Sequence, residues 1–105
     1  MQKAVELTHA DKLDRLAEVA VKVGLGLKPG QEIVMTAPVE ALDLVRLVTR
    51  HAYKAGAKNV TTLFDDEQCA LLKYENAKDT SFDYAPSWLY DGMAKAYGSG
   101  AARLA

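Results

Sequence analysis

Two short apolar stretches joined by an amphipathic helical pattern constrain the fold of this chain more than any other feature. Residues 33–37 (IVMTA) are almost wholly apolar and residues 59–64 (NVTTLF) are rich in β-branched side chains, so both are typical of strands. Between them, apolar residues recur at helical spacing: Ala41, Leu44, Val45, Val48 and Ala52. Two strands joined by one helix pair in parallel through a right-handed crossover. The sequence therefore predicts a βαβ unit within a parallel sheet.

A further helix is predicted before this unit. Thr8 can cap its N-terminus, with Asp11 three residues on in a short relative of the capping box. The apolar residues of this helix share one face: Leu13, Leu16, Ala17 and Ala20. Its charged residues, Asp14 and Glu18 among them, are predicted on the opposite, solvated face.

The glycine-rich stretch 24–30 (GLGLKPG) is predicted to end that helix and to form a turn. Gly24 and Gly26 suit the end of a helix, and Pro29 and Gly30 suit the central pair of a type II turn. A phosphate-binding loop follows a strand, opens a helix and ends in Gly-Lys-Ser or Gly-Lys-Thr. This stretch follows a helix and lacks that ending, so the turn is favoured.

The second half of the chain is predicted to hold two more helices and a third strand. One helix runs from Asp65 to about Asn76, and residues 77–84 are polar and irregular. Another helix spans residues 87–97, and residues 101–105 open a third strand. The order α-β-α-β-α-α-β predicts a small three-layer α/β domain with a parallel sheet.

Length and composition fit one globular domain covering residues 1–105. Half of the 105 residues are apolar and 26% are charged, which provides enough apolar surface for a core without a disulfide or metal staple. The single cysteine cannot form an internal disulfide. Because the sequence stops inside the third predicted strand, we expect the chain to be the N-terminal piece of a longer protein.

Charge and hydropathy exclude several classes of partner. The formal net charge of −1 disfavours nucleic acid, whose binding domains carry a basic excess. No apolar run approaches the ~18 residues needed to span a bilayer, so no membrane partner is predicted. Residues 1–9 lack the apolar segment of a secretory signal, so a cytoplasmic location is predicted.

The strongest candidate for a polar site is the pair Asp65 and Asp66. Open α/β sheets place ligands at the carboxyl ends of their strands, and adjacent carboxylates can hold Mg²⁺ as in receiver domains. Such a site needs another acid on the neighbouring strand, which ends instead in Thr36-Ala37-Pro38, and a lysine at a comparable strand end. Capping of the following helix is therefore the favoured role of this pair.

The remaining reactive or aromatic residues form no catalytic pattern. His9 and His51 lie 42 positions apart and match no metal-binding motif, and His51 is predicted to pack beside the second helix's apolar stripe. Cys69, one turn into the third helix, is predicted to be a small buried hydrophobe. Trp88 and Tyr90 can form an interface patch, but core or semi-buried packing is favoured for them. The same packing role is favoured for the other helical tyrosines: Tyr53, Tyr74 and Tyr97.

We therefore assign no catalytic, cofactor-binding or metal-binding residue within residues 1–105. From the residues alone, the chain suits either a fragment of an enzyme or a stand-alone flavodoxin-like module. The module would bind a ligand or partner at the strand-end edge near Thr36 and Asp65.

One long stretch resembles a known family. Residues 16–31 (LAEVAVKVGLGLKPGQ) resemble the opening of the aminopeptidase T family of metalloaminopeptidases, which includes aminopeptidases S and II. The likeness continues through residues 33–41 (IVMTAPVEA) and 52–60 (AYKAGAKNV). It extends to the Asp65-Asp66 pair and to the helix that begins Pro86-Ser87-Trp88.

The resemblance implies a role for this region rather than a site within it. Members of the family are about four times as long and remove N-terminal residues from peptides. Their two divalent metal ions, such as zinc, cobalt or magnesium, are held by ligands in the larger C-terminal part, so no ligand is carried onto this sequence. Members are generally homodimers. The resemblance thus implies an N-terminal domain that helps shape the cleft or the dimer and is inactive alone.

Overall fold

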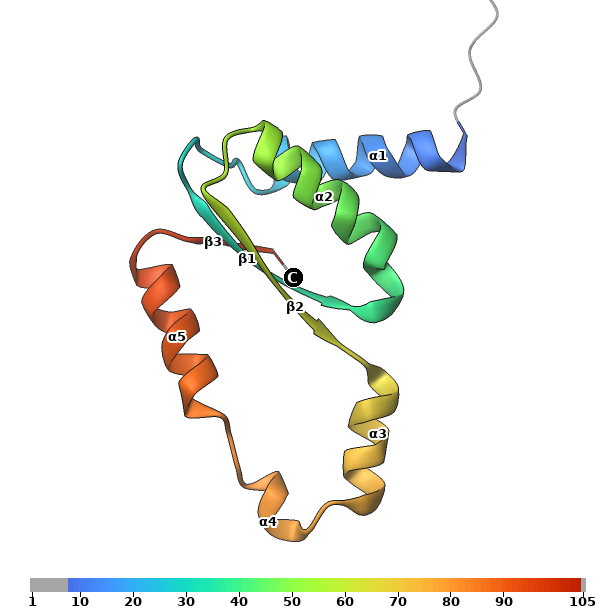
Figure 1. Cartoon of the computed structure of the whole chain (residues 1–105), viewed down its shortest axis with the longest axis vertical. Coiled ribbons are helices and arrows are strands. Elements are labelled where there is room, and N and C mark those ends of the chain that lie inside the picture. Colours follow the sequence, from blue (N-terminus) through green and yellow to red (C-terminus); the bar gives the residue numbers. More distant parts are fainter. Residues whose placement is uncertain (1–7, 105) are drawn as a thin grey trace, which may run out of the picture.

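A three-stranded parallel sheet forms the centre of the molecule (Figure 1). The computed structural model describes residues 8–104. Strand β1 (Glu32–Pro38) lies between β2 (Asn59–Asp65) and β3 (Ala102–Leu104). Both pairings are parallel, with Ile33 opposite Val60 on one side and Ala102 on the other. The predicted parallel βαβ unit is confirmed.

Two helices cover one face of the sheet (Figure 1). They are α1 (His9–Val19), which continues into a π-helix η1 (Ala20–Gly24), and α2 (Leu42–Lys54), which follows a single 3₁₀ turn η2 (Val39–Ala41). The predicted cap of α1 is present: Thr8 Oγ1 accepts from Asp11 N at 3.1 Å, and Asp11 Oδ2 accepts from Thr8 N at 3.3 Å. The π-helix was not predicted. Its wide turn is closed by Leu25 N donating to Ala20 O at 2.9 Å.

The core lies between this helical layer and the central strand. Its buried apolar residues are Ala17 and Val21 from the first helical segment, Ile33, Met35 and Ala37 from β1, and Val45, Val48 and Ala52 from α2. Strand β1 has a strand on each side, and Val34, which points to the opposite face of the sheet, is also buried. Burial on both faces explains why the sequence of β1 is nearly continuously apolar. The predicted inward stripe of α2 is confirmed by the burial of Val45, Val48 and Ala52.

The turn before β1 packs against the end of α2. Gln31 N donates to Lys28 O at 3.1 Å, and Gly30 has φ +81°, as the predicted type II turn requires. Gly30 N donates to Gly56 O at 2.7 Å. Gly56 itself has φ +99°, and a Cβ there would lie 3.2 Å from Pro29. The glycine-rich stretch is therefore a helix end and a turn, as predicted.

The segment from Asp66 to Ala101, here called the arm, projects from the sheet (Figure 1). It contains α3 (Glu67–Asn76), the one-turn helix α4 (Asp79–Phe82) and α5 (Ser87–Gly98). The stretch 77–84 was predicted to be irregular; that prediction is wrong for the single turn of α4. None of the three helices buries a residue.

Helix α5 returns the chain along the second face of the sheet. Trp88, Leu89 and Met93 from α5 line a common groove with Val34 and Leu63 from the sheet. The order of layers is therefore α1 and α2, the sheet, and α5, and the predicted α/β class and element order are confirmed. Within residues 8–104, no helix combines the length and the apolar character needed to cross a bilayer.

Candidate functional site

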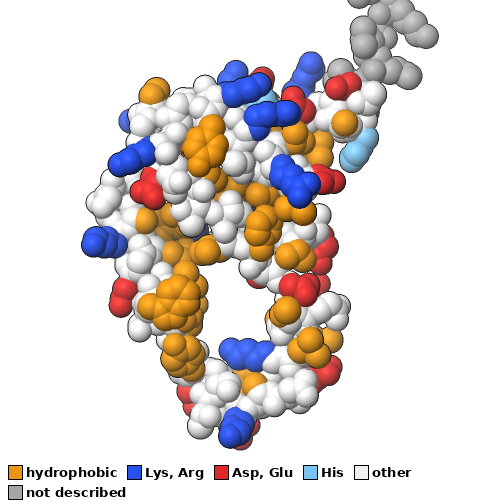
Figure 2. Space-filling model, viewed as in Figure 1, with side chains coloured by type: hydrophobic (Ala, Val, Ile, Leu, Met, Phe, Trp, Pro, Cys, Tyr) orange, Lys and Arg blue, Asp and Glu red, His pale blue; other side chains and the backbone are white. Residues whose placement is uncertain are grey.

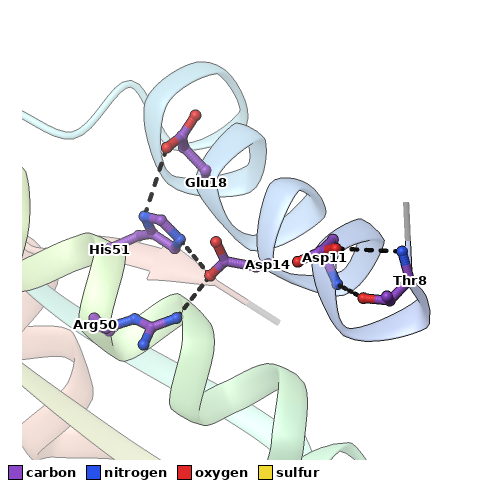
Figure 3. A network of polar contacts seen from close by, with 6 residues as sticks. All are labelled: Thr8, Asp11, Asp14, Glu18, Arg50 and His51. Carbon is purple, nitrogen blue, oxygen red and sulfur yellow. Dashed lines mark hydrogen bonds and ion pairs between the residues drawn. The ribbon is translucent and has the colours of Figure 1, made fainter. Parts of the chain in front are cut away.

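A buried histidine joins the two helices that cover the sheet (Figure 3). His51 of α2 is 8% exposed, and its Nε2 lies 2.9 Å from Asp14 Oδ1 of α1. The same oxygen accepts from Arg50 Nη2 at 2.8 Å. On the other side of the ring, Glu18 Oε2 lies 3.9 Å from His51 Nδ1. His51 thus packs in the interface with both ring nitrogens facing carboxylates.

The hydrogen bonds to Asp14 favour the ionised form of its carboxyl group. The hydrogen bond with His51, followed by that from Arg50, lowers the pKa of the Asp14 carboxyl below its usual value. Asp14 and Glu18 were predicted on a solvated face; their side chains are 41% and 46% exposed, but they also face α2, because α1 packs with this strip along α2. The spacing of Asp14 and Glu18 by one helical turn is the only feature of the sequence that could have pointed to this contact with His51. Their partners lie more than thirty residues later in the chain.

The packing prediction for His51 is confirmed, with polar partners that the sequence did not reveal. His9 lies on the exposed first turn of α1, so the two histidines do not form one site. Arg50 and Asp14 fill the ring's Nε2 side, and Glu18 faces its Nδ1 side. The cluster is therefore an interhelical clamp rather than an open coordination site.

The acidic pair at the end of β2 caps a helix, as predicted. Asp66 is the N-cap of α3, and its Oδ1 accepts from Gln68 N at 3.4 Å. Asp65 is the last residue of β2 and pairs in register with Pro38. No carboxylate therefore stands opposite this pair on the adjacent strand.

Cys69 is exposed, so the prediction that it is a buried hydrophobe is wrong. The reason is that α3 projects away from the core. Its Sγ lies 3.5 Å from Asp66 Oδ2, and the hydrogen bond to this carboxylate raises the pKa of the Cys69 thiol. The arrangement opposes thiolate formation and gives no reactive nucleophile.

No metal centre is formed by the part of the chain that the structure describes. Among residues 8–104, no three histidine, cysteine, aspartate or glutamate side chains gather in a way that suits a metal ion. The side chains present therefore do not fit the two-metal site that the resemblance implies for the longer protein.

An apolar groove of about 180 Å³ opens at the carboxyl ends of the strands. From the sheet it is lined by Met35, Ala37 and Pro38 of β1 and by Leu104 of β3. The helical layer adds Leu16, Ala20, Ala41, Leu44, Val45 and Val48, and Thr36 is the only polar side chain of this lining. This edge groove can take an aliphatic group, but it offers no acid, base or nucleophile.

A second groove, of about 280 Å³, lies between α5 and the far face of the sheet. We call it the arm groove; its main lining residues are Val34, Thr61, Leu63, Trp88, Leu89 and Met93. Trp88 is 72% exposed and Tyr90 is 57% exposed. Figure 2 shows an opening through the molecule beside this region, with apolar side chains on both of its sides.

The prediction that the aromatic residues take core or semi-buried positions is wrong for Tyr74, Trp88 and Tyr90. Trp88 and Tyr90 are exposed, Tyr74 is 77% exposed, and Tyr53 is about half exposed although its Oη accepts from Val60 N at 3.0 Å. Tyr97 is partly buried as well. The physical reason is that Tyr74, Trp88 and Tyr90 lie on the arm, whose helices bury no residue, and this exposure favours the interface patch that was the alternative for Trp88 and Tyr90.

Comparison with known proteins shows which protein family this chain resembles. Residues 9–105 match the family model described as thermophilic metalloprotease (M29). The chain is 48% identical over 93 residues to aminopeptidase T of Thermus thermophilus, and 41% identical over 95 residues to aminopeptidase AmpS of Bacillus subtilis. These alignments cover 89% and 90% of this chain, but only 23% of each relative.

A solved structure supports the same assignment. The structure of wild-type AmpT from Thermus thermophilus superposes with a TM-score of 0.83 at 47% identity, over 87% of this chain and 23% of that chain. The chain thus spans less than a quarter of the relatives it matches. Its sequence and its fold agree on one assignment: this chain belongs to the thermophilic metalloprotease (M29) family.

Proposed function

We propose that this chain is the N-terminal domain of a metal-dependent aminopeptidase that removes N-terminal residues from peptides. The family match across residues 9–105 is the observation that carries the proposal. Relatives with 41–48% identity are named aminopeptidases, and this chain corresponds to about a quarter of their length.

In this proposal the domain supplies no metal ligand. The gathered polar groups of residues 8–104 have structural roles: Asp66 caps α3, and Asp14 and Glu18 clamp His51. The two divalent ions of the proposed enzyme, such as zinc, cobalt or magnesium, are then held by the remainder of the longer chain. Metal ions bound there would supply Lewis-acid chemistry for peptide hydrolysis.

The domain's own contribution is a rigid wall and an apolar docking surface. The sheet and its helical layer are fixed by a buried core, whereas the arm leaves aromatic and aliphatic side chains exposed. Such a surface suits a part that shapes the cleft or the dimer of the enzyme. We further propose a cytoplasmic homodimer that acts on peptides, with neither nucleic acid nor membrane as partner.

A chimera tests this function. Residues 9–105 replace the matching stretch of aminopeptidase T from Thermus thermophilus, and hydrolysis of leucine p-nitroanilide is measured with added Zn²⁺, Co²⁺ or Mg²⁺. We expect the chimera to be active and the isolated 105-residue chain to be inactive. A folded chimera without activity contradicts the proposed role, and turnover by the isolated chain, after removal of host peptidases, contradicts the assignment of the ligands to the remainder.

A flavodoxin-like binding module is the other candidate. The edge groove near Thr36 is the observation that favours it, since open sheets bind ligands at this edge. Activity of the chimera decides against it.

A further inference from the structure

The arm is the part of this domain least supported by its own chain. Helices α3, α4 and α5 bury no residue, although they carry large apolar side chains. The exposed ones include Leu71, Leu72 and Tyr74 on α3 and Trp88 and Tyr90 on α5. Contiguous exposed apolar surface marks an interaction site.

The lengths of these helices indicate that they need a packing partner. Helix α3 has 10 residues and α5 has 12, and isolated helices shorter than about 12–15 residues are marginal in water. Stability of such helices comes from packing of an apolar face. The sheet supplies part of this packing for α5 through the arm groove, but Trp88 at that groove remains 72% exposed.

The solved relative shows the context in which a similar fold occurs. The arm makes up about a third of this chain, so an alignment covering 87% of the chain includes most of it. The projecting arm is therefore retained at a TM-score of 0.83 inside a chain of which this domain matches only 23%. The same open geometry thus occurs where more than three-quarters of an aminopeptidase chain is also present.

We infer that the arm groove is the docking site for an apolar segment of the remaining, metal-binding part of the same aminopeptidase chain, with Trp88 as its central anchor. This inference rests on the proposed function and names the surface that serves it. The occupant inserts between α5 and the far face of the sheet, covering the indole of Trp88 and the half-buried side chains of Leu63 and Met93. Tryptophans that a partner covers and desolvates are typical hot spots of protein interfaces.

Hydrogen–deuterium exchange of the chimera described above tests the inference. We expect the α5 amides to exchange at least about tenfold more slowly in the full-length chimera than in the isolated 105-residue chain. Trp88→Glu in the chimera is expected to restore most of the fast exchange. Val23→Glu is the matched control, because Val23 is 76% exposed and lies outside both grooves. It is expected to leave the protection of α5 unchanged.

The isolated chain shows whether the variant itself folds. Because Trp88 is largely exposed there, Trp88→Glu is expected to leave the melting temperature of the isolated chain nearly unchanged. Equal α5 exchange in the chimera and the isolated chain overturns the inference, as does an equal effect of Trp88→Glu and Val23→Glu in the chimera.

Two further outcomes separate this inference from its alternatives. If α5 of the isolated chain becomes protected as its concentration rises, and sedimentation shows a dimer abolished by Trp88→Glu, the occupant is a second copy and the inference is wrong. An inactive chimera with a protected α5 refutes the proposed function and retains the interface. An active chimera with an unprotected α5 refutes the docking of a segment in the arm groove and retains the proposed function.

Discussion

Substitution of Val45 tests how α2 faces the sheet. Val45 is 6% exposed and packs in the core, whereas its neighbour Arg46 is exposed. The pair therefore compares two adjacent positions of one helix that differ in burial. Val45→Ala and Val45→Asp are expected to cause a moderate and a large loss of folding stability at the buried position, and Arg46→Ala is the control.

The expected magnitudes follow from burial. Val45→Ala removes two methyl-sized groups, each contributing about 0.8 kcal/mol, and leaves a small cavity, for a total of about 2 kcal/mol. Val45→Asp loses the whole apolar contribution of about 1.5–3 kcal/mol and adds several kcal/mol for an unpaired buried carboxylate. Since domains are stable by only about 5–15 kcal/mol, the aspartate variant is expected to be unfolded. Arg46→Ala is expected to change the stability by about 0.5 kcal/mol or less.

Thermal unfolding followed by circular dichroism measures these differences. For a domain of this size, we expect Val45→Ala to melt about 10 °C below the parent chain. Val45→Asp is expected to show no cooperative transition, and Arg46→Ala is expected to melt with the parent. Similar melting temperatures for the Val45→Asp and Arg46→Ala variants contradict the assigned facing of α2.

Three further predictions concern charge, backbone and the sheet edge. Because the pKa of Asp14 is lowered in the folded chain, its ionised form stabilises the fold above the ordinary aspartate range, and this contribution is lost as the pH falls below about 4. Asp14→Asn should therefore flatten the acid side of the curve of urea midpoint against pH, and unchanged curvature contradicts the clamp. Gly56→Ala is expected to lower the free energy of unfolding by at least about 1–2 kcal/mol, because φ at this position is +99° and the new Cβ would lie 3.2 Å from Pro29. Gly92→Ala is the control, because a Cβ at Gly92 has no atom within 4 Å, and it should be neutral or stabilising in urea unfolding. The 105-residue chain is expected to self-associate through the edge of β3. Analytical ultracentrifugation should show less association after deletion of residues 101–105. A monomeric parent chain, or association that the deletion leaves unchanged, argues against this.

Local sequence pattern alone determined the sheet and its helical cover. The apolar run 33–37 required a strand flanked on both sides, and the stripe through Val45, Val48 and Ala52 required a helix with one buried face. Thr8 and Gly30 specified a cap and a turn through chemistry that acts over a few residues. These features were predictable because each depends on residues that are neighbours in the chain.

Only the tertiary structure decided which polar groups meet. Asp14 and Glu18 carry the pattern of a solvated helix face, and their partners His51 and Arg50 lie on another helix. No spacing within α1 encodes the angle at which α2 crosses it. The site that was predictable, Asp66 as a cap, acts within its own helix, whereas the clamp on His51 depends on the packing of two helices.

The arm shows the same division most clearly. The sequence determined that α3 and α5 are helices and that they carry Cys69, Tyr74, Trp88 and Tyr90, and the typical tendency of such residues to be buried led to wrong predictions of their exposure. Their surroundings depend on whether the arm folds back over the sheet or projects from it. That choice is made by long-range packing, because local propensity fixes the helix but not the surface against which its apolar side chains are buried.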